Sequence, residues 1–267
     1  MGIESYIRNY RNHYLLCGTD DSNRMSPTIG AGFFSMAYYP MEQLKMEFSF
    51  RTEYTSPSRK MNFSPRLAAN YYWGNMMLSG IVGRYTQLPE NNCLVRRPQL
   101  MSEVCMQYNL GVQYDYEGRF CKAELYYKDY DRLALEETDA DTKAVFLTSN
   151  GYGHSKGIDL FFRDRASFKN LEYQLSYTYN IAKRKYREYL ELTTPQYATR
   201  HNAAWVVKYS LPRLRSIVSV TDRFSSGRPY HNPMLPGLMN DEVKPYNSLD
   251  LGVTFLASKM FCAMFSQ

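Results

Sequence analysis

Apolar and polar residues alternate one by one along several long stretches of the chain. From Leu44 to Arg51 the even positions are apolar and the odd positions polar, and the pattern recurs over 106–114, 171–180 and 248–255. Successive side chains of a β-strand point to opposite faces, so each stretch predicts a strand with one apolar and one polar face. Less regular versions cover about 31–39, 65–73, 76–86, 120–131, 156–166, 202–210 and 214–224. The pattern therefore predicts about eleven strands, many longer than the usual five or six residues.

The connections between these strands fall into two lengths that alternate along the chain. Tight ones are expected at 40–43, 74–75, 117–119, 168–170 and 211–213, and long polar ones at about 55–64, 87–103, 132–155, 183–201 and 225–246. Short turns at one end of a sheet and long loops at the other are typical of transmembrane β-barrels. A tilted strand needs about 9–11 residues to cross the bilayer, and the 25 tyrosines and 14 phenylalanines suit aromatic girdles.

The predicted fold class is therefore all-β: an antiparallel up-and-down transmembrane β-barrel segment of about 11–12 strands. A large soluble β-sandwich or propeller with tyrosine-rich strands remains the alternative. The chain contains no apolar run of about 18 residues, which a membrane-spanning helix would need. The N-terminal segment 1–8 has no apolar core and no small-residue cleavage site, so it does not read as a signal peptide.

Charge and reactive residues point to no catalytic or cofactor chemistry. The net charge of +6 is spread along the 267 residues and no nucleic-acid motif accompanies it, so no nucleic-acid partner is expected. The five cysteines form no CxxC pair and the four histidines are far apart, so neither a metal nor another cofactor is expected. No phosphate-loop, dinucleotide or zinc-protease motif occurs, and the chain is not expected to be an enzyme. His201-Asn202 near serines is the one arrangement that a barrel hydrolase could use.

Five short stretches resemble TonB-dependent outer-membrane receptors of the Bacteroidetes type, in the same order and with similar spacing. They are Phe63–Tyr71 (FSPRLAANY), Gly83–Pro89 (GRYTQLP), Ser155–Leu160 (SKGIDL), Arg200–Asn202 (RHN) and Ser226–Tyr230 (SGRPY). Each motif is weak alone, but together they cover about 30–257. The resemblance implies that 1–267 is a partial receptor barrel domain with strands from about 31 to 257.

The resemblance also implies what the parent protein does. Receptors of this family have a 22-stranded barrel around an N-terminal plug, and TonB drives uptake of a scarce ligand through it. No plug, TonB box or signal peptide is found before residue 30, and 259–267 does not resemble the family's last strand. The chain is therefore expected to be the C-terminal part of a barrel in the Gram-negative outer membrane. Its expected partners are outer-membrane lipid, the plug of the parent chain, TonB, and a small-molecule, metal-chelate or glycan ligand.

Two other functions remain open: a complete barrel of about 12 strands acting as a pore, adhesin or hydrolase, and a soluble β-rich binding module. Under the receptor interpretation, the polar faces of the strands predict lumen-facing residues. These are Glu47, Arg51, Glu53, Gln107, Gln113, Asp115, Glu172, Gln174 and Asp250. The long loops predict two ligand-binding clusters that mix charge with aromatic rings. The first holds Arg184, Lys185, Tyr186, Arg187 and Tyr189, and the second holds Arg228, Tyr230 and His231.

Overall fold

The computed structural model describes residues 2–7, 10–16, 19–25, 28–56, 59–139, 141 and 143–256, and describes no side chains over 5–27. Twelve strands form one antiparallel sheet. They are β1 (Gly2–Ile7), β4 (Thr28–Met41), β5 (Leu44–Thr55), β6 (Lys60–Trp73), β7 (Met76–Gln87), β8 (Glu103–Tyr116), β9 (Arg119–Thr138), β10 (Val145–Asp164), β11 (Leu171–Lys185), β12 (His201–Leu211), β13 (Ser216–Ser225) and β16 (Tyr246–Phe255).

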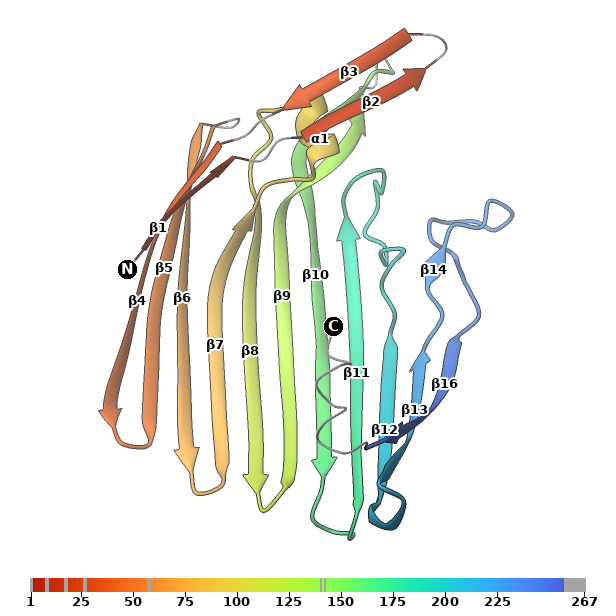
Figure 1. Ribbon diagram of the computed structural model, residues 1–267. Helices are drawn as coiled ribbons and strands as arrows, with labels where there is room; N and C mark the ends of the chain where they lie inside the picture. The colour runs from red at the N-terminus through yellow and green to blue at the C-terminus, as the bar shows by residue number, and fades with distance from the viewer. Residues whose placement is uncertain are drawn as a thin grey trace.

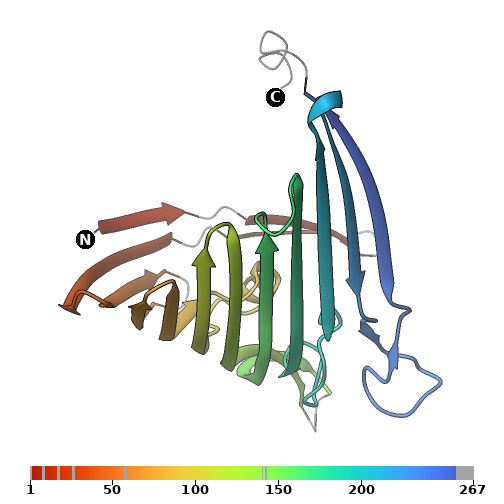
Figure 2. The ribbon, with the colours of Figure 1, turned by 90° about the horizontal axis from the view of Figure 1, so that it is seen from below.

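These strands follow one another in the sheet in chain order, which confirms the predicted up-and-down topology. Two small two-stranded sheets, β2 (Tyr10–Leu16) with β3 (Thr19–Met25) and β14 (Pro229–Tyr230) with β15 (Asp241–Glu242), lie at one end of the strands together with helix α1 (Asn91–Arg96) (Figure 1). The tight turns lie at the other end. Seen from below, the sheet is a bent wall whose outermost strands, β1 and β16, pair on one side only (Figure 2).

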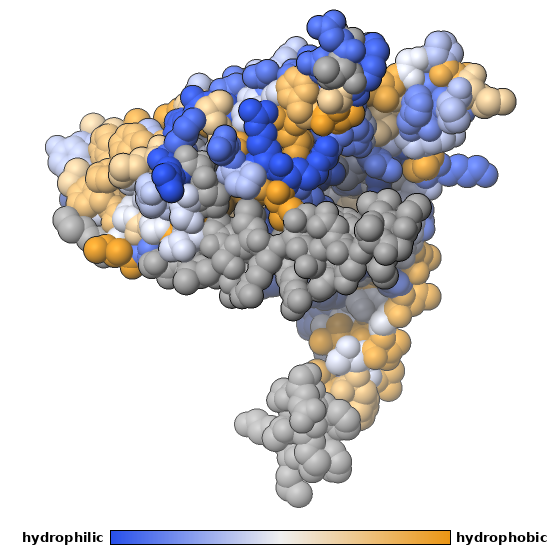
Figure 3. Space-filling view, turned by 90° about the horizontal axis from the view of Figure 1, so that it is seen from above, coloured by the Kyte–Doolittle hydropathy of each residue, from blue (hydrophilic) through white to orange (hydrophobic). Residues whose placement is uncertain are grey.

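The register of the sheet separates an apolar face from a polar one. Directly paired residues share a face, and one such row runs from Leu110 through Leu125 and Ile158 to Tyr179. The neighbouring residues of the opposite face are polar: Asn109 donates a hydrogen bond to Glu124. Thr178 donates one to Asp159, 2.6 Å between oxygens. The period-two pattern therefore predicted the two faces correctly. Viewed from above, onto the end with the long connections, hydrophilic and apolar residues both face the viewer (Figure 3).

The prediction of five long connections was wrong at two positions. β5 ends at Thr55 and β6 begins at Lys60, so the connection between them is short, and β9 and β10 are 20 residues each and leave only 139–144 between them. The polar sequence of 132–155 suggested a loop, but this segment forms the end of the β9–β10 hairpin. The two strands of an antiparallel hairpin satisfy each other's backbone hydrogen bonds and need no further partner strand. Likewise β11 continues through Lys185, so the loop predicted over 183–201 begins only at Tyr186.

The N-terminal strands β1, β2 and β3 were not predicted, because 2–25 lacks a sustained alternation of apolar and polar residues. A strand expected to begin near 214 begins at Ser216, after the short 3₁₀ turn η1 (Pro212–Leu214). The expectation for 259–267 lies outside the described residues.

Gly157 on β10 leaves room for a tyrosine that crosses the polar face. A Cβ at this position would lie 2.1 Å from the carbonyl oxygen of Tyr179 and 2.5 Å from the hydroxyl of Tyr126. That hydroxyl donates to Asn180 at 2.9 Å, and Ser155 donates to the same amide oxygen at 2.8 Å. Only glycine allows this three-residue network to form over the strand.

We predict that Gly157→Ala lowers the free energy of unfolding by about 1–3 kcal/mol, since the methyl group must displace a backbone carbonyl and the tyrosine. The urea midpoint of unfolding measures this change. Gly80→Ala is the matched control, because a Cβ at Gly80 meets nothing within 4 Å. Equal midpoints for the two variants would show that the close contacts at Gly157 relax without cost.

Candidate functional site

All nine residues predicted to face a lumen lie on the polar face of the sheet. Ladder pairs place them on the face opposite the Leu110 row. Five of the nine form ion pairs: Glu47 with Lys45, Arg51 with Glu53, Glu172 with Arg165 and Asp250 with Arg223. The polar face is therefore a wall of mutually paired charges. That this wall lines a lumen stays a prediction.

The first predicted ligand cluster is mostly packed inside the connection between β11 and β12. Tyr186 and Tyr189 are 8% and 5% exposed, meet edge to face at 5.4 Å between ring centroids, and pack on Leu133 of the β9–β10 hairpin. Burial raises the pKa of both phenols, so they stay neutral at physiological pH. These two rings form a small core and are not displayed on the surface of the loop. That this cluster binds a ligand stays a prediction.

Arg187 links the β11–β12 connection to the β9–β10 hairpin and to the connection that holds α1. Its backbone N–H donates to the carbonyl of Ala134 at 2.6 Å, and its carbonyl accepts from the N–H of Glu136 at 2.7 Å. Its guanidinium pairs with Glu90, just before α1. The connection that holds α1 packs Leu94 and Leu100 on the same hairpin. These contacts join two connections and the end of the β9–β10 hairpin into one packed unit, called here the loop cap (residues 88–102, 133–139, 143–148 and 186–200).

Arg184 lies at the edge of the loop cap, on the polar face of β11. Its guanidinium stacks on Tyr130 at 4.1 Å from the ring centroid, and among the described residues its buried Nε has no hydrogen-bond partner. Beside it opens a pocket of about 250 Å³. The pocket is lined by Tyr85, Thr86, Gln87, Glu103, Val104, Cys105, Tyr130, Leu133 and Arg184. Of these residues the sequence predicted only Arg184, because a long loop was expected to begin at residue 183, whereas Arg184 and the other lining residues all lie in strands.

The second predicted cluster is more open. Arg228 and His231 are exposed, whereas the Tyr230 hydroxyl donates to Asp241 at 2.5 Å between oxygens. That hydrogen bond raises the pKa of Tyr230 and lowers the pKa of Asp241. The same connection reaches the loop cap, where Leu238 and Met239 pack against the Tyr186 core. The two predicted clusters are thus linked by packing, although their charged groups are not in contact.

His201 and Asn202 do not form a catalytic pair. They are consecutive residues of β12, so their side chains lie on opposite faces. His201 Nδ1 lies 2.8 Å from the Tyr177 hydroxyl, and Asn202 is hydrogen-bonded to Thr199. Within the described ranges no group of three or more histidine, cysteine or acidic side chains is placed to hold a metal ion. No helix among those residues is long and apolar enough to cross a membrane.

The sequence matches the model of a known protein family over nearly the whole sheet. The model of the family described as TonB dependent receptor-like, beta-barrel matches residues 5–259. The chain belongs to this TonB-dependent receptor β-barrel family. Membership in the family agrees with three features of the sheet: its twelve-stranded meander, one apolar and one polar face, and tight turns at one end with longer connections at the other.

Solved structures of receptors have the same fold. The FrpB iron transporter from Neisseria meningitidis aligns with a TM-score of 0.72 and 8% identity, over 87% of this chain and 39% of its own. A mutant of the ferric enterobactin receptor PfeA from Pseudomonas aeruginosa aligns with a TM-score of 0.71 and 14% identity, over 91% and 39%. The ferric-catecholate import receptor Fiu from Escherichia coli K12 gives 0.68 and 10%, over 96% and 44%.

The chain therefore spans about two fifths of the length of these receptors. At such low identity the likeness concerns the fold alone. No curated protein matches the chain by sequence.

Proposed function

We propose that this chain forms part of the barrel wall of a TonB-dependent receptor of the Bacteroidetes type, in its C-terminal half. The parent protein would import a scarce ligand across the outer membrane, with the polar face against the plug and TonB supplying the energy. The observation that carries the proposal is the twelve-stranded meander of a receptor family, apolar on one face and ion-paired on the other.

The two outermost strands support a place within a larger barrel. In the described sheet β1 and β16 each pair on one side only. An unpaired strand edge in hydrocarbon leaves backbone N–H and C=O groups without partners, at several kcal/mol for each group. Further strands of the parent protein would remove this cost. A free-standing barrel of twelve strands would need β1 to pair with β16, and a soluble module would need a cover for the apolar face.

The Arg184 pocket is the best candidate for ligand contact. It combines one guanidinium, two tyrosine rings and a partnerless Nε, which suits an anionic or aromatic group. At about 250 Å³ it is smaller than the pockets of about 300–1,000 Å³ that hold drug-sized ligands. It would therefore hold one arm of a larger ligand. Solved neighbours include receptors for ferric enterobactin and ferric catecholates, so a metal chelate is the first class to test.

Uptake in cells tests the proposal. Cells that express the parent protein should accumulate a radiolabelled ligand, starting with ferric enterobactin, only when TonB is present, and deletion of the gene should abolish this accumulation. Uptake that continues without TonB would favour an open pore. Recovery of the protein in the soluble fraction, with no heat-modifiable band in outer membranes, would contradict the receptor proposal.

Arg184→Met should weaken binding of the transported ligand about tenfold, since the variant loses the charge-assisted contact together with the guanidinium that stacks on Tyr130. Equilibrium binding of radiolabelled ferric enterobactin to the purified parent protein measures the effect. Lys208→Met is the control, because Lys208 lies on the same polar face near the opposite end of the strands. Unchanged affinity in Arg184→Met would exclude this pocket as the ligand site.

A further inference from the structure

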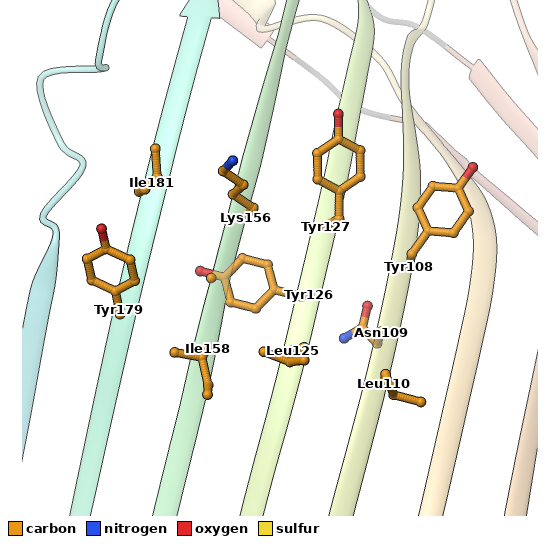
Figure 4. Close-up of a pocket in the computed structure, with 11 residues that line it drawn as sticks. Tyr108, Asn109, Leu110, Leu125, Tyr126, Tyr127, Lys156, Ile158, Tyr179 and Ile181 are labelled. Carbon is orange, nitrogen blue, oxygen red and sulfur yellow. The ribbon is translucent and has the colours of Figure 1, made fainter.

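A furrow runs along the apolar face over β8, β9, β10 and β11. Its upper part has a volume of about 570 Å³ and is lined by apolar and tyrosine side chains of all four strands, together with Asn109 and Lys156 (Figure 4). A second hollow of about 570 Å³ continues along the same strands toward the tight turns. The furrow deepens over β9, where the small residues Ala123 and Cys121 lie between Val112 and Tyr114 on one side and Leu160 and Phe162 on the other.

Positive charge gathers at the end of this furrow that faces the long connections. Lys183 lies directly opposite His154, and Lys156 lies two residues further along β10, so all three share the apolar face. Residues in such diagonal positions are about 7–8 Å apart. Both lysines are exposed, and within the described residues neither ammonium group has an ion-pair partner. Two unpaired like charges at this spacing repel each other and favour an anion between them.

One acidic group lies near the lysines. Asp129 lies opposite His154 on β9, also on this face and diagonal to Lys156, and among the described residues no ion pair joins it to either lysine. Arg84 follows in the same row, beyond Met106. Tyrosines complete the end of the furrow: the hydroxyls of Tyr108, Tyr127 and Tyr179 point toward the long connections, as does the Lys156 ammonium group (Figure 4). The end of the furrow thus offers hydrogen-bond donors beside positive charge.

We propose that this furrow binds a lipid with a phosphate on its head group, held between Lys156 and Lys183, with an acyl chain lying along β9. The inference rests on the proposed placement of the sheet in the outer membrane, and it assigns the lipid to the leaflet on the side of the long connections. From Lys156 to Phe162 the furrow is about 20 Å long at the rise of a strand. One leaflet is half of the hydrocarbon core of about 30 Å, or about 15 Å, so the furrow is long enough for the acyl chain of one leaflet.

Charge complementarity favours a lipid with a phosphate over a neutral lipid or a free phosphate ion. A zwitterionic or uncharged lipid would fill the furrow but leave the two ammonium groups without a counter-ion. A free phosphate ion would pair with the lysines but leave the furrow unused. A lipid phosphate does both, because its charge lies at the polar boundary of the bilayer and its chain in the hydrocarbon.

The test uses the parent protein that carries this chain, purified in a nonionic detergent. Native mass spectrometry would count bound dioleoylphosphatidic acid and, separately, dioleoylphosphatidylcholine. We expect phosphatidic acid to bind about tenfold more tightly than phosphatidylcholine, and the double variant K156Q/K183Q to remove that preference. The matched control is Lys128→Gln, which removes a lysine from the polar face of β9, where it stacks on Tyr126. This control should keep the preference.

Several outcomes would overturn the proposal. Equal affinity for the two lipids, or loss of the preference in Lys128→Gln, would show that the protein's overall charge and not this site attracts phosphate. Competition by millimolar inorganic phosphate with no binding of lipid would assign the lysines to a free anion. A heat-modifiable band from outer membranes reports insertion separately, so an inserted protein without the preference contradicts the lipid site alone.

Discussion

Leu110→Arg should lower the free energy of unfolding of the inserted protein by about 2–4 kcal/mol, the cost of an arginine near the bilayer midplane on the lipid face of a barrel. Leu110 is 61% exposed and lies mid-strand on β8, in the apolar row with Leu125 and Ile158. The free energy of unfolding of a whole domain is only about 5–15 kcal/mol, so this single charge would remove a large share of that stability. Urea titration in lipid vesicles, followed by heat-modifiable migration, measures the change.

Two controls isolate the effect of the membrane. Gln113→Arg places the same charge three residues away on the polar face, beside the Lys122–Glu124 ion pair, and should change stability little. Leu110→Ala removes the leucine without adding charge. A soluble β-module would give a different result, since an arginine on an exposed face in water costs nearly nothing. Similar unfolding midpoints for Leu110→Arg and Gln113→Arg would therefore contradict lipid contact at this face.

The polarity of the two faces could be predicted because it is local. A strand facing lipid on one side and water or protein on the other must alternate, and Leu44–Arg51 displays this directly in the sequence. The tight turns were found for the same reason: Gly74 and Gly118 adopt positive φ of 55° and 81°, which glycine allows at little cost. Both features depend on neighbours in the chain.

The loop cap could not be predicted, because its contacts join distant segments. Residues 132–155 are polar enough to suggest a loop, yet Leu133, Leu135 and Leu147 are buried under connections far away in the chain. Tyr186 looked like a ligand-binding ring because aromatic residues beside arginines are common to binding surfaces and to small cores. Only the three-dimensional packing distinguishes the two. The sequence did not predict the Arg184 pocket for the same reason, since the residues that line it come from four different strands.

Tyr186→Ala should open the loop cap without unfolding the sheet. The ring is 8% exposed and packs on Tyr189 and Leu133, and removal of a buried aromatic ring costs about 3–5 kcal/mol. The Tyr186 core lies at the end of the strands, between the β11–β12 connection and the tip of the β9–β10 hairpin, so we expect the loss of stability to cause local opening there. Hydrogen exchange at the backbone N–H groups of Arg187 and Glu136, which bond across to the hairpin and back, should accelerate by about a hundredfold to a few thousandfold.

Leu190→Ala serves as the control, since Leu190 belongs to the same connection but is 52% exposed. It should leave exchange at both amides unchanged, and amides in the middle of β8 and β9 should keep their protection in either variant. If Tyr186→Ala leaves exchange at Arg187 unchanged, the tyrosine core does not hold the connections together. If protection is lost in the sheet as well, the cap and the strands unfold as one cooperative unit, and the receptor could not move these loops without disturbing its wall.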